Sequence, residues 1–226
     1  MDAQMLQQSV LQYSADEIQM IYSRKGLLYR FCKRFGDIVL SLIGLIVLSP
    51  LFLIVAIIIK LEDGGAVFYI QERNGINGKV FRMYKFRSMC VNAEAIHKDL
   101  LNQNELDGPA FKMKNDPRVT KVGKFIRKTS IDELPQLINI VKGDMSIVGP
   151  RPLPTYETAQ CNAYQNQRLL VKPGLTCYWQ CCGRNNISFD EWIEMDLRYI
   201  REAGIWTDTK LILKTFGAVI RSEGAY

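Results

Sequence analysis

The longest apolar stretch of the chain, residues 38–59, contains no charged side chain. At a rise of about 1.5 Å per residue, a straight helix of this length reaches about 33 Å, which matches the hydrocarbon core of a bilayer. A helix of a soluble domain normally shows a polar face, and this stretch shows none. We therefore expect residues 38–59 to enter a membrane.

Ser49 and Pro50 stand at the midpoint of this stretch. Proline lacks a backbone donor and clashes with the preceding turn, so we expect the helix to break there. Each half, at about 17 Å, is too short to cross a bilayer alone. Basic residues flank both ends, and positive charge marks the cytoplasmic side; they are Arg24, Lys25, Arg30, Lys33 and Arg34 before the stretch and Lys60, Arg73 and Lys79 after it. A re-entrant segment that enters and leaves on one face is favoured over a kinked helix that crosses.

The pattern beyond residue 60 predicts a β-hairpin followed by helices. Phe68–Ile70 and Val80–Phe86 are the expected strands, separated by two Asn-Gly pairs that tolerate positive φ. A helical pattern begins near residue 91, and further helices are expected at Leu134–Val141, Glu191–Ala203 and Lys210–Ile220. The last is amphipathic, which suits either an interfacial membrane helix or a surface helix packed on its own core. The predicted fold class is α+β, predominantly helical with a small β-hairpin.

Composition narrows the choice of partner. The 226 residues carry a formal net charge of +6, with an isoelectric point near 9.0. Such a balance favours an anionic partner: nucleic acid, acidic lipid or a phosphorylated ligand. The chain has six cysteines, no Cys-x-x-Cys pair and one histidine, a pattern that argues against a zinc site.

Two adjacent acids, Asp132 and Glu133, stand in the segment "RKTSIDELPQ". Ser130 and Glu133 fit a helix capping box, and acids are favoured in a first helical turn. Pro135 weakens this reading, because it would be the fifth helical residue and would lose a backbone bond. A helix that starts at or after Asp132 avoids the loss and leaves Asp132 at a helix N-terminus, which attracts phosphate.

The surroundings of these acids are basic: Lys112, Lys114, Arg118, Lys121, Lys124, Arg127 and Lys128 all lie nearby in the sequence. Arg151 stands between two prolines, and Arg184 follows the apolar, aromatic stretch "KPGLTCYWQ". Any one of these cations alone would be read as a solvated surface charge. Together they suit a ligand with several phosphate oxygens, and the two acids suit a divalent metal that bridges carboxylate and diphosphate.

Several motifs, in one order, carry a resemblance. They are "KRFGDIVLSL", Ser49-Pro50, "YKFRSM", "NDPRVTKVGKFIRKTSIDELPQL", "KGDMSIVGPRP", "KPGLT", "GRN" and "DTKLILKT". Across residues 30–222 the chain resembles the bacterial sugar transferase family, monotopic phosphoglycosyl transferases that begin lipid-linked glycan assembly. One departure is that Cys177, Cys181 and Cys182 stand where the family has small or apolar residues; reduced thiols fill that role.

The resemblance implies transfer of a sugar phosphate from a UDP-sugar to polyprenyl (undecaprenyl) phosphate, with release of UMP. Asp132 would be the nucleophile of a ping-pong reaction through a phosphosugar-aspartyl intermediate, and Glu133 together with Asp132 would hold Mg²⁺. The resemblance further implies phosphate or nucleotide contacts for Arg127, Arg151 and Arg184, and for Lys85 and Arg87 within "YKFRSM".

The expected organisation follows from the same resemblance. Residues 1–29 form an extension, residues 30–60 the re-entrant helix, and residues 61–226 a catalytic domain with interfacial helices on the cytoplasmic face of the bacterial inner membrane. Membrane phospholipids are expected partners, and a homodimer is left open. Two alternatives remain: a nucleic-acid-binding protein, which the apolar stretch and the lack of a helix-turn-helix or RNP-like signature oppose, and a membrane-anchored scaffold with an inactive site.

Overall fold

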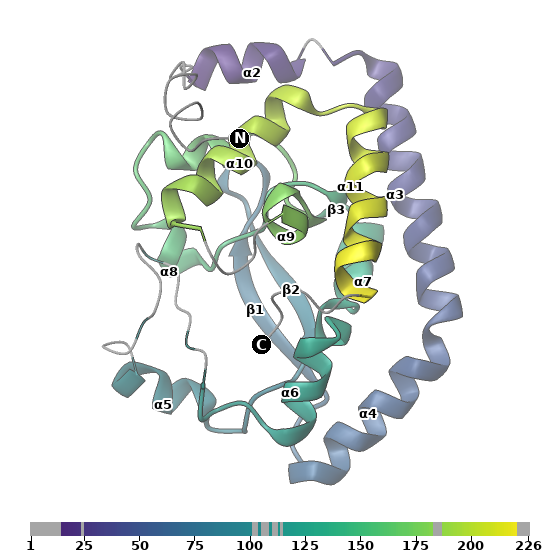
Figure 1. The fold of residues 1–226 in the computed structure, drawn as a ribbon, viewed down its shortest axis with the longest axis vertical. Helices are drawn as coiled ribbons and strands as arrows, with labels where there is room; N and C mark the ends of the chain where they lie inside the picture. Colours follow the sequence, from purple (N-terminus) through teal and green to yellow (C-terminus); the bar gives the residue numbers. More distant parts are fainter. Residues whose placement is uncertain are drawn as a thin grey trace.

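The computed structural model describes residues 15–23, 25–100, 104, 109, 113, 115–182 and 187–220. The described part is mostly helical with a small antiparallel hairpin, as the sequence predicts (Figure 1). In chain order the elements are α2 (Ala15–Ser23), α3 (Leu27–Val47), α4 (Ser49–Asp63), β1 (Phe68–Asn74), η1 (Ile76–Gly78), β2 (Val80–Phe86), α5 (Ala93–Leu100), α6 (Lys121–Lys128), η3 (Ile131–Glu133), α7 (Gln136–Lys142), β3 (Ser146–Val148), α8 (Thr155–Thr158), η4 (Gln165–Leu170), β4 (Gly174–Thr176), α9 (Tyr178–Cys182), α10 (Phe189–Glu202) and α11 (Ile205–Ile220), where η marks a 3₁₀ turn.

The apolar stretch forms two helices with a bend at the predicted position. The helix axis bends by 59° between α3 and α4. Pro50 lies in the first turn of α4, where its missing N–H breaks no helical bond. The pair is longer than the predicted residues 30–60, since α3 begins at Leu27 and α4 ends at Asp63. No single helix among the described residues has both the length and the apolar character to cross a membrane, whereas the bent pair together passes on these two criteria.

The polar residues of α3 bind the rest of the chain. Lys33 donates to the carbonyl of Val148 in β3 (3.0 Å), and Arg34 binds the last carbonyls of α7. The buried carboxylate of Asp37 accepts the backbone N–H of Ile147 (2.9 Å). The interpretation of Lys33 and Arg34 as flanking membrane charges therefore missed their main contacts, which fasten α3 to the domain beside it.

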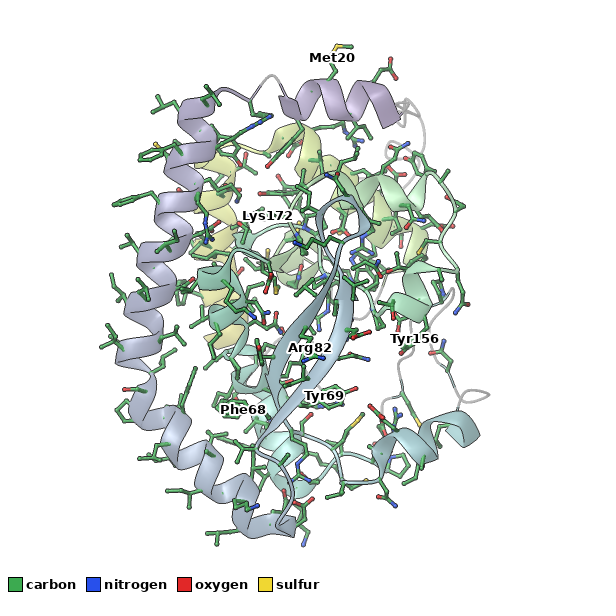
Figure 2. All side chains as sticks on the ribbon, turned by 180° about the vertical axis from the view of Figure 1, so that it is seen from behind. Met20, Phe68, Tyr69, Arg82, Tyr156 and Lys172 are labelled. Carbon is green, nitrogen blue, oxygen red and sulfur yellow. The ribbon has the colours of Figure 1, made fainter. Side chains whose placement is uncertain are left out.

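The hairpin forms as predicted, with a longer first strand. β1 runs to Asn74 and pairs antiparallel with β2, and the connection contains Asn77 at φ 53° and Gly78 at φ 75°. Phe81 and Met83 on one face of β2 pack against α7. The opposite face of β2 carries the exposed Arg82, which is labelled in Figure 2.

A second pair of strands was not predicted. β3 and β4 pair in parallel, and a Cβ on Gly149 directly after β3 would lie 2.5 Å from the carbonyl oxygen of Lys172. Only glycine permits this approach, which fixes the path of the chain into the segment that carries Arg151.

The main core lies between α10, α11 and β3. α10 starts with a capping box between Ser188 and Glu191, two residues before the predicted start. α11 begins five residues before the predicted Lys210 and buries Leu211, while Trp206 and Phe216 are 70% and 65% exposed. α11 therefore has one face on the core and a second apolar face that the described residues do not cover.

Candidate active site

The two acids lie in a 3₁₀ turn between α6 and α7. Ser130 adopts the left-handed conformation (φ 56°) and its side chain caps no helix, so the capping box is absent here. α7 begins only at Gln136, after Pro135. The helix thus starts after Asp132, as expected, but two residues later than the predicted Leu134, and Asp132 lies in the turn that precedes it and not at its N-terminus.

Glu133 is held by two cations. Its Oε1 lies 2.9 Å from Lys85 Nζ and 2.6 Å from Arg151 Nη2. Burial raises the pKa of Glu133, but the attraction of Arg151 and Lys85 outweighs burial and holds that pKa well below 4.5. Glu133 is consequently ionised at every physiological pH, and its charge is compensated.

The contacts of Asp132 differ from those of Glu133, although both acids stand next to each other in the sequence. Its side chain is 7% exposed, and within the described part of the chain its carboxylate makes no hydrogen bond or ion pair. Burial raises the pKa of Asp132 to about 6, with Lys85 opposing the shift and the charge of Glu133 adding to it. At pH 7 such a group is about nine-tenths ionised. Asp132 is therefore a carboxylate with unused lone pairs in a basic environment.

Arg127 reaches this environment because α6 packs closely on the segment directly after β2. A Cβ on Gly123 would collide with the carbonyl oxygen of Ser88, so this contact also requires glycine. Arg127 Nε then donates to Ser88 Oγ (2.8 Å), and the attraction of Asp132 partly offsets the lowering of the Arg127 pKa by burial. The remaining predicted cations differ: Lys121, Lys124 and Lys128 are exposed, Arg118 pairs with Asp116, and Lys112 and Lys114 lie outside the described residues.

Asn139 on α7 fixes the position of the β2 backbone next to Lys85, and so the position of Lys85 relative to Glu133. The Asn139 side chain is fully buried; it donates to the carbonyl of Arg82 (2.7 Å) and accepts the backbone N–H of Tyr84 (3.0 Å). These bonds lock α7 to β2 one residue before Lys85. Sequence reasoning missed Asn139, although a polar residue within the apolar run "LINIV" was a usable signal.

Two predicted phosphate ligands are not part of this cluster. Arg87 binds the carboxylate of Asp63 at the end of α4 and the carbonyl of Ala66, on the side of the bent helix pair α3–α4. Arg184 lies outside the described residues. The structure thus brings together Lys85, Arg127, Asp132, Glu133 and Arg151. The phosphate-binding roles of the three cations in this cluster, and of Arg87 and Arg184, stay predictions.

The predicted magnesium site can be tested against these ligands. Among the described residues, no group of three or more His, Cys, Asp or Glu side chains could enclose a metal. Mg²⁺ is, however, often bound by one or two carboxylates together with substrate phosphates and water. The adjacent carboxylates of Asp132 and Glu133, one of them without a partner, fit this mode and no closed protein cage.

Comparison with known proteins agrees with the resemblance. The model of the family described as "Bacterial sugar transferase" matches residues 28–222. The chain is 50% identical over 207 residues to the galactosyl transferase CpsE of Streptococcus agalactiae, which covers 90% of this chain and 46% of that protein. It is 44% identical over 201 residues to the undecaprenyl-phosphate galactose phosphotransferase of Salmonella typhimurium, with coverage of 87% and 42%. The exopolysaccharide production protein ExoY of Sinorhizobium fredii is 40% identical over 198 residues, with coverage of 86% and 88%. The chain thus spans less than half of the first two relatives and most of the third.

Proposed function

The chain belongs to the bacterial sugar transferase family, and on this basis we propose that it transfers a sugar phosphate from a UDP-sugar to undecaprenyl phosphate and releases UMP. The acceptor is taken from the names of relatives such as the Salmonella galactose phosphotransferase and the UDP-glucose:undecaprenyl-phosphate glucose-1-phosphate transferase of Escherichia coli. The observation that carries the proposal is the division of roles between two neighbouring acids: Glu133 is neutralised by Lys85 and Arg151, and the buried Asp132 is unpaired.

This division selects the nucleophile. A carboxylate held by two cations is a poor nucleophile, because its charge is neutralised and its pKa is depressed. Asp132 has a pKa of about 6, which leaves it ionised at pH 7 and more basic than an ordinary aspartate. Asp132 is therefore the attacking group, and Glu133 holds Arg151 and Lys85 in place beside it.

In the first step, a carboxylate oxygen of Asp132 attacks the sugar-bearing phosphorus of the donor. The bond between that phosphorus and the bridging oxygen breaks, and UMP leaves with the electron pair, which gives a phosphosugar-aspartyl intermediate. In the second step, a phosphate oxygen of the acceptor attacks the same phosphorus and the Asp132 carboxylate is released. Arg127, Lys85 and Arg151 supply positive charge where negative charge accumulates. Bound Mg²⁺, held by Glu133 and Asp132, would further neutralise the diphosphate.

A lipid acceptor requires the site to be close to a membrane. Apolar side chains are exposed on α3, α4 and α11; among them are Phe31 (70%), Ile46 (72%), Leu53 (64%) and Leu213 (66%). α11 lies beside α3 in Figure 1, so these side chains belong to neighbouring elements. The bent pair α3–α4 acts as the re-entrant element and α11 as an interfacial helix, with the site on the cytoplasmic face of the bacterial inner membrane.

The decisive experiment measures UMP release across a panel of UDP-sugars, with undecaprenyl phosphate and Mg²⁺. Donor alone should add the mass of one sugar phosphate to the peptide that contains Asp132. Asp132→Asn should abolish both signals in a folded protein, and Asp190→Asn, at an exposed aspartate of α10, should change neither. Turnover by the Asp132→Asn variant, or label on another peptide, would exclude Asp132 as the nucleophile.

A further inference from the structure

Arg151 lies at one end of a stack of four side chains. Its Cζ is 5.5 Å from the ring centroid of Trp179, which stacks on Trp192 with centroids 4.4 Å apart and an interplanar angle of 13°. The Cζ of Arg168 lies 5.3 Å from the centroid of the Trp192 ring. Each of the two stacked indoles therefore has one arginine guanidinium beside its ring, Arg151 at Trp179 and Arg168 at Trp192.

A carboxylate closes each end of the stack. Glu133 binds the Arg151 guanidinium at the active site, and Asp196 lies 2.7 Å from the Arg168 guanidinium at the buried end. The Arg168 and Asp196 side chains are 3% and 0% exposed. Arg168 also donates to the backbone carbonyl of Arg151. Arg151 is thus fixed twice by the same network, at its guanidinium through the rings and at its backbone.

The chemistry of the buried end argues against a purely stabilising role. An ion pair without solvent contact costs desolvation and often gives less stability than a well-packed apolar pair of equal volume. Asp196 and Arg168 occupy such a site, with the Arg168 guanidinium beside the Trp192 ring. Arg151 has a long side chain with several rotatable bonds, and its productive orientation must be held against that freedom.

We propose that Trp179, supported by Trp192, Arg168 and Asp196, positions the Arg151 guanidinium for phosphate transfer. This role rests on the proposed function, because Arg151 acts there on the phosphate of the donor. Trp179 is a positioning residue, since it acts through Arg151. Its planar face restricts the guanidinium to one plane, and the Glu133 carboxylate sets its direction within that plane.

The first test is a double-mutant cycle on UMP release by the full-length protein. Trp179→Leu removes the aromatic face and should lower kcat about tenfold, as expected for a desolvated cation–π contact, whereas Trp179→Phe should stay within about threefold. Phe189→Leu is the matched control: it removes a buried ring that packs edge-on against Trp192 at 5.7 Å without touching Arg151. It should lower the thermal midpoint and keep kcat. In an Arg151→Lys background, Trp179→Leu should lower kcat by less than about twofold. An equal loss in both backgrounds would overturn the proposal.

The second test needs neither turnover nor the Trp179→Leu variant to fold. Stacked indoles give a strong near-ultraviolet circular dichroism signal, so Arg151→Lys should change that signal through Trp179. Arg127→Lys, in the same active site but hydrogen-bonded to Ser88, should leave it unchanged. Identical spectra for the wild type and Arg151→Lys would refute the coupling. A wild-type protein that turns over no UDP-sugar would refute the proposed function. The circular dichroism result would then still show whether Arg151 and Trp179 are coupled.

Discussion

Lys85 offers the sharpest test of how the active site prepares its nucleophile. Its ammonium lies 2.9 Å from Glu133 and attracts the Asp132 carboxylate, whose pKa burial has raised to about 6. Lys85→Met removes this attraction and keeps the apolar part of the side chain. Loss of an opposite charge at such range shifts a carboxyl pKa upward by about 1 to 3 units. The pKa of Asp132 should then lie between about 7 and 9.

The expected change in rate follows from the ionised fraction of Asp132. At pH 7 that fraction falls from about nine-tenths in the wild type to between about one half and one hundredth in Lys85→Met. The sign is fixed by the reaction: a carboxylate nucleophile must be ionised, so activity is lost as pH falls through its pKa. A higher pKa therefore moves the acid limb of the profile to higher pH.

The assay is the pH profile of kcat/KM for UMP release between pH 5 and 10. The wild type should show an acid limb near pH 6, and Lys85→Met should show a displaced limb with partial recovery of activity above pH 8. Arg82→Met is the matched control, since Arg82 lies on the same strand with its side chain on the exposed face (Figure 2). A uniform loss at every pH, with an unmoved limb, would show that Lys85 acts on the substrate and does not tune Asp132.

Three further outcomes are expected. Asn139→Ala leaves the buried carbonyl of Arg82 and a strand N–H without partners, and should lower the free energy of unfolding by about 2 to 5 kcal/mol in denaturant titrations; an unchanged midpoint would contradict the clamp. Exchange of the exposed Leu213 and Phe216 for glutamate should weaken the quenching of Trp206 fluorescence by brominated lipid in anionic vesicles, even where α3–α4 still holds the protein on the vesicles; unchanged quenching would exclude α11 as an interfacial helix. Ser130→Gly should preserve the free energy of unfolding, and Ser130→Val should lower it by about 1 to 3 kcal/mol, because the left-handed conformation is unfavourable for β-branched residues. Equal free energies of unfolding for the two variants would argue against that conformation.

Two copies of the same sequence pattern show where local prediction succeeds and fails. Both Ser130-Ile-Asp-Glu133 and Ser188-Phe-Asp-Glu191 fit the capping box, yet only the second forms one. Pro135 makes the difference, because no proline follows Ser188 within the next turns and α10 can propagate. The rejection of the Ser130 cap could therefore be predicted from the sequence. The 3₁₀ turn found in its place could not be predicted, since it depends on where α6 packs and in which direction the chain leaves it.

The cluster around the acids lies beyond local reasoning for a different reason. The hairpin and the long helices follow from periodicity and turn residues, which act over a few positions. Lys85 and Arg151 reach Glu133 across 48 and 18 residues, and those contacts exist only once the hairpin, α7 and β3 have packed. Trp179 and Asn139 were missed because an aromatic or amide within an apolar run reads as core until its partners are known.

The segment "YKFRSM" connects the bent helix pair α3–α4 to the candidate active site. Lys85 binds Glu133, Phe86 packs among Val55 and Ile59 of α4, and Arg87 binds the carboxylate at the end of α4. Ser88 then accepts the hydrogen bond from Arg127. Consecutive side chains of an extended strand point in opposite directions, so four neighbouring residues can hold two structures at a fixed separation. In the proposed reaction a water-soluble donor and a lipid-bound acceptor meet at one phosphorus, so we expect the distance between Asp132 and the bent pair α3–α4 to matter for activity. Arg87, expected from the sequence to bind phosphate, contributes to that distance through its ion pair with Asp63 at the end of α4.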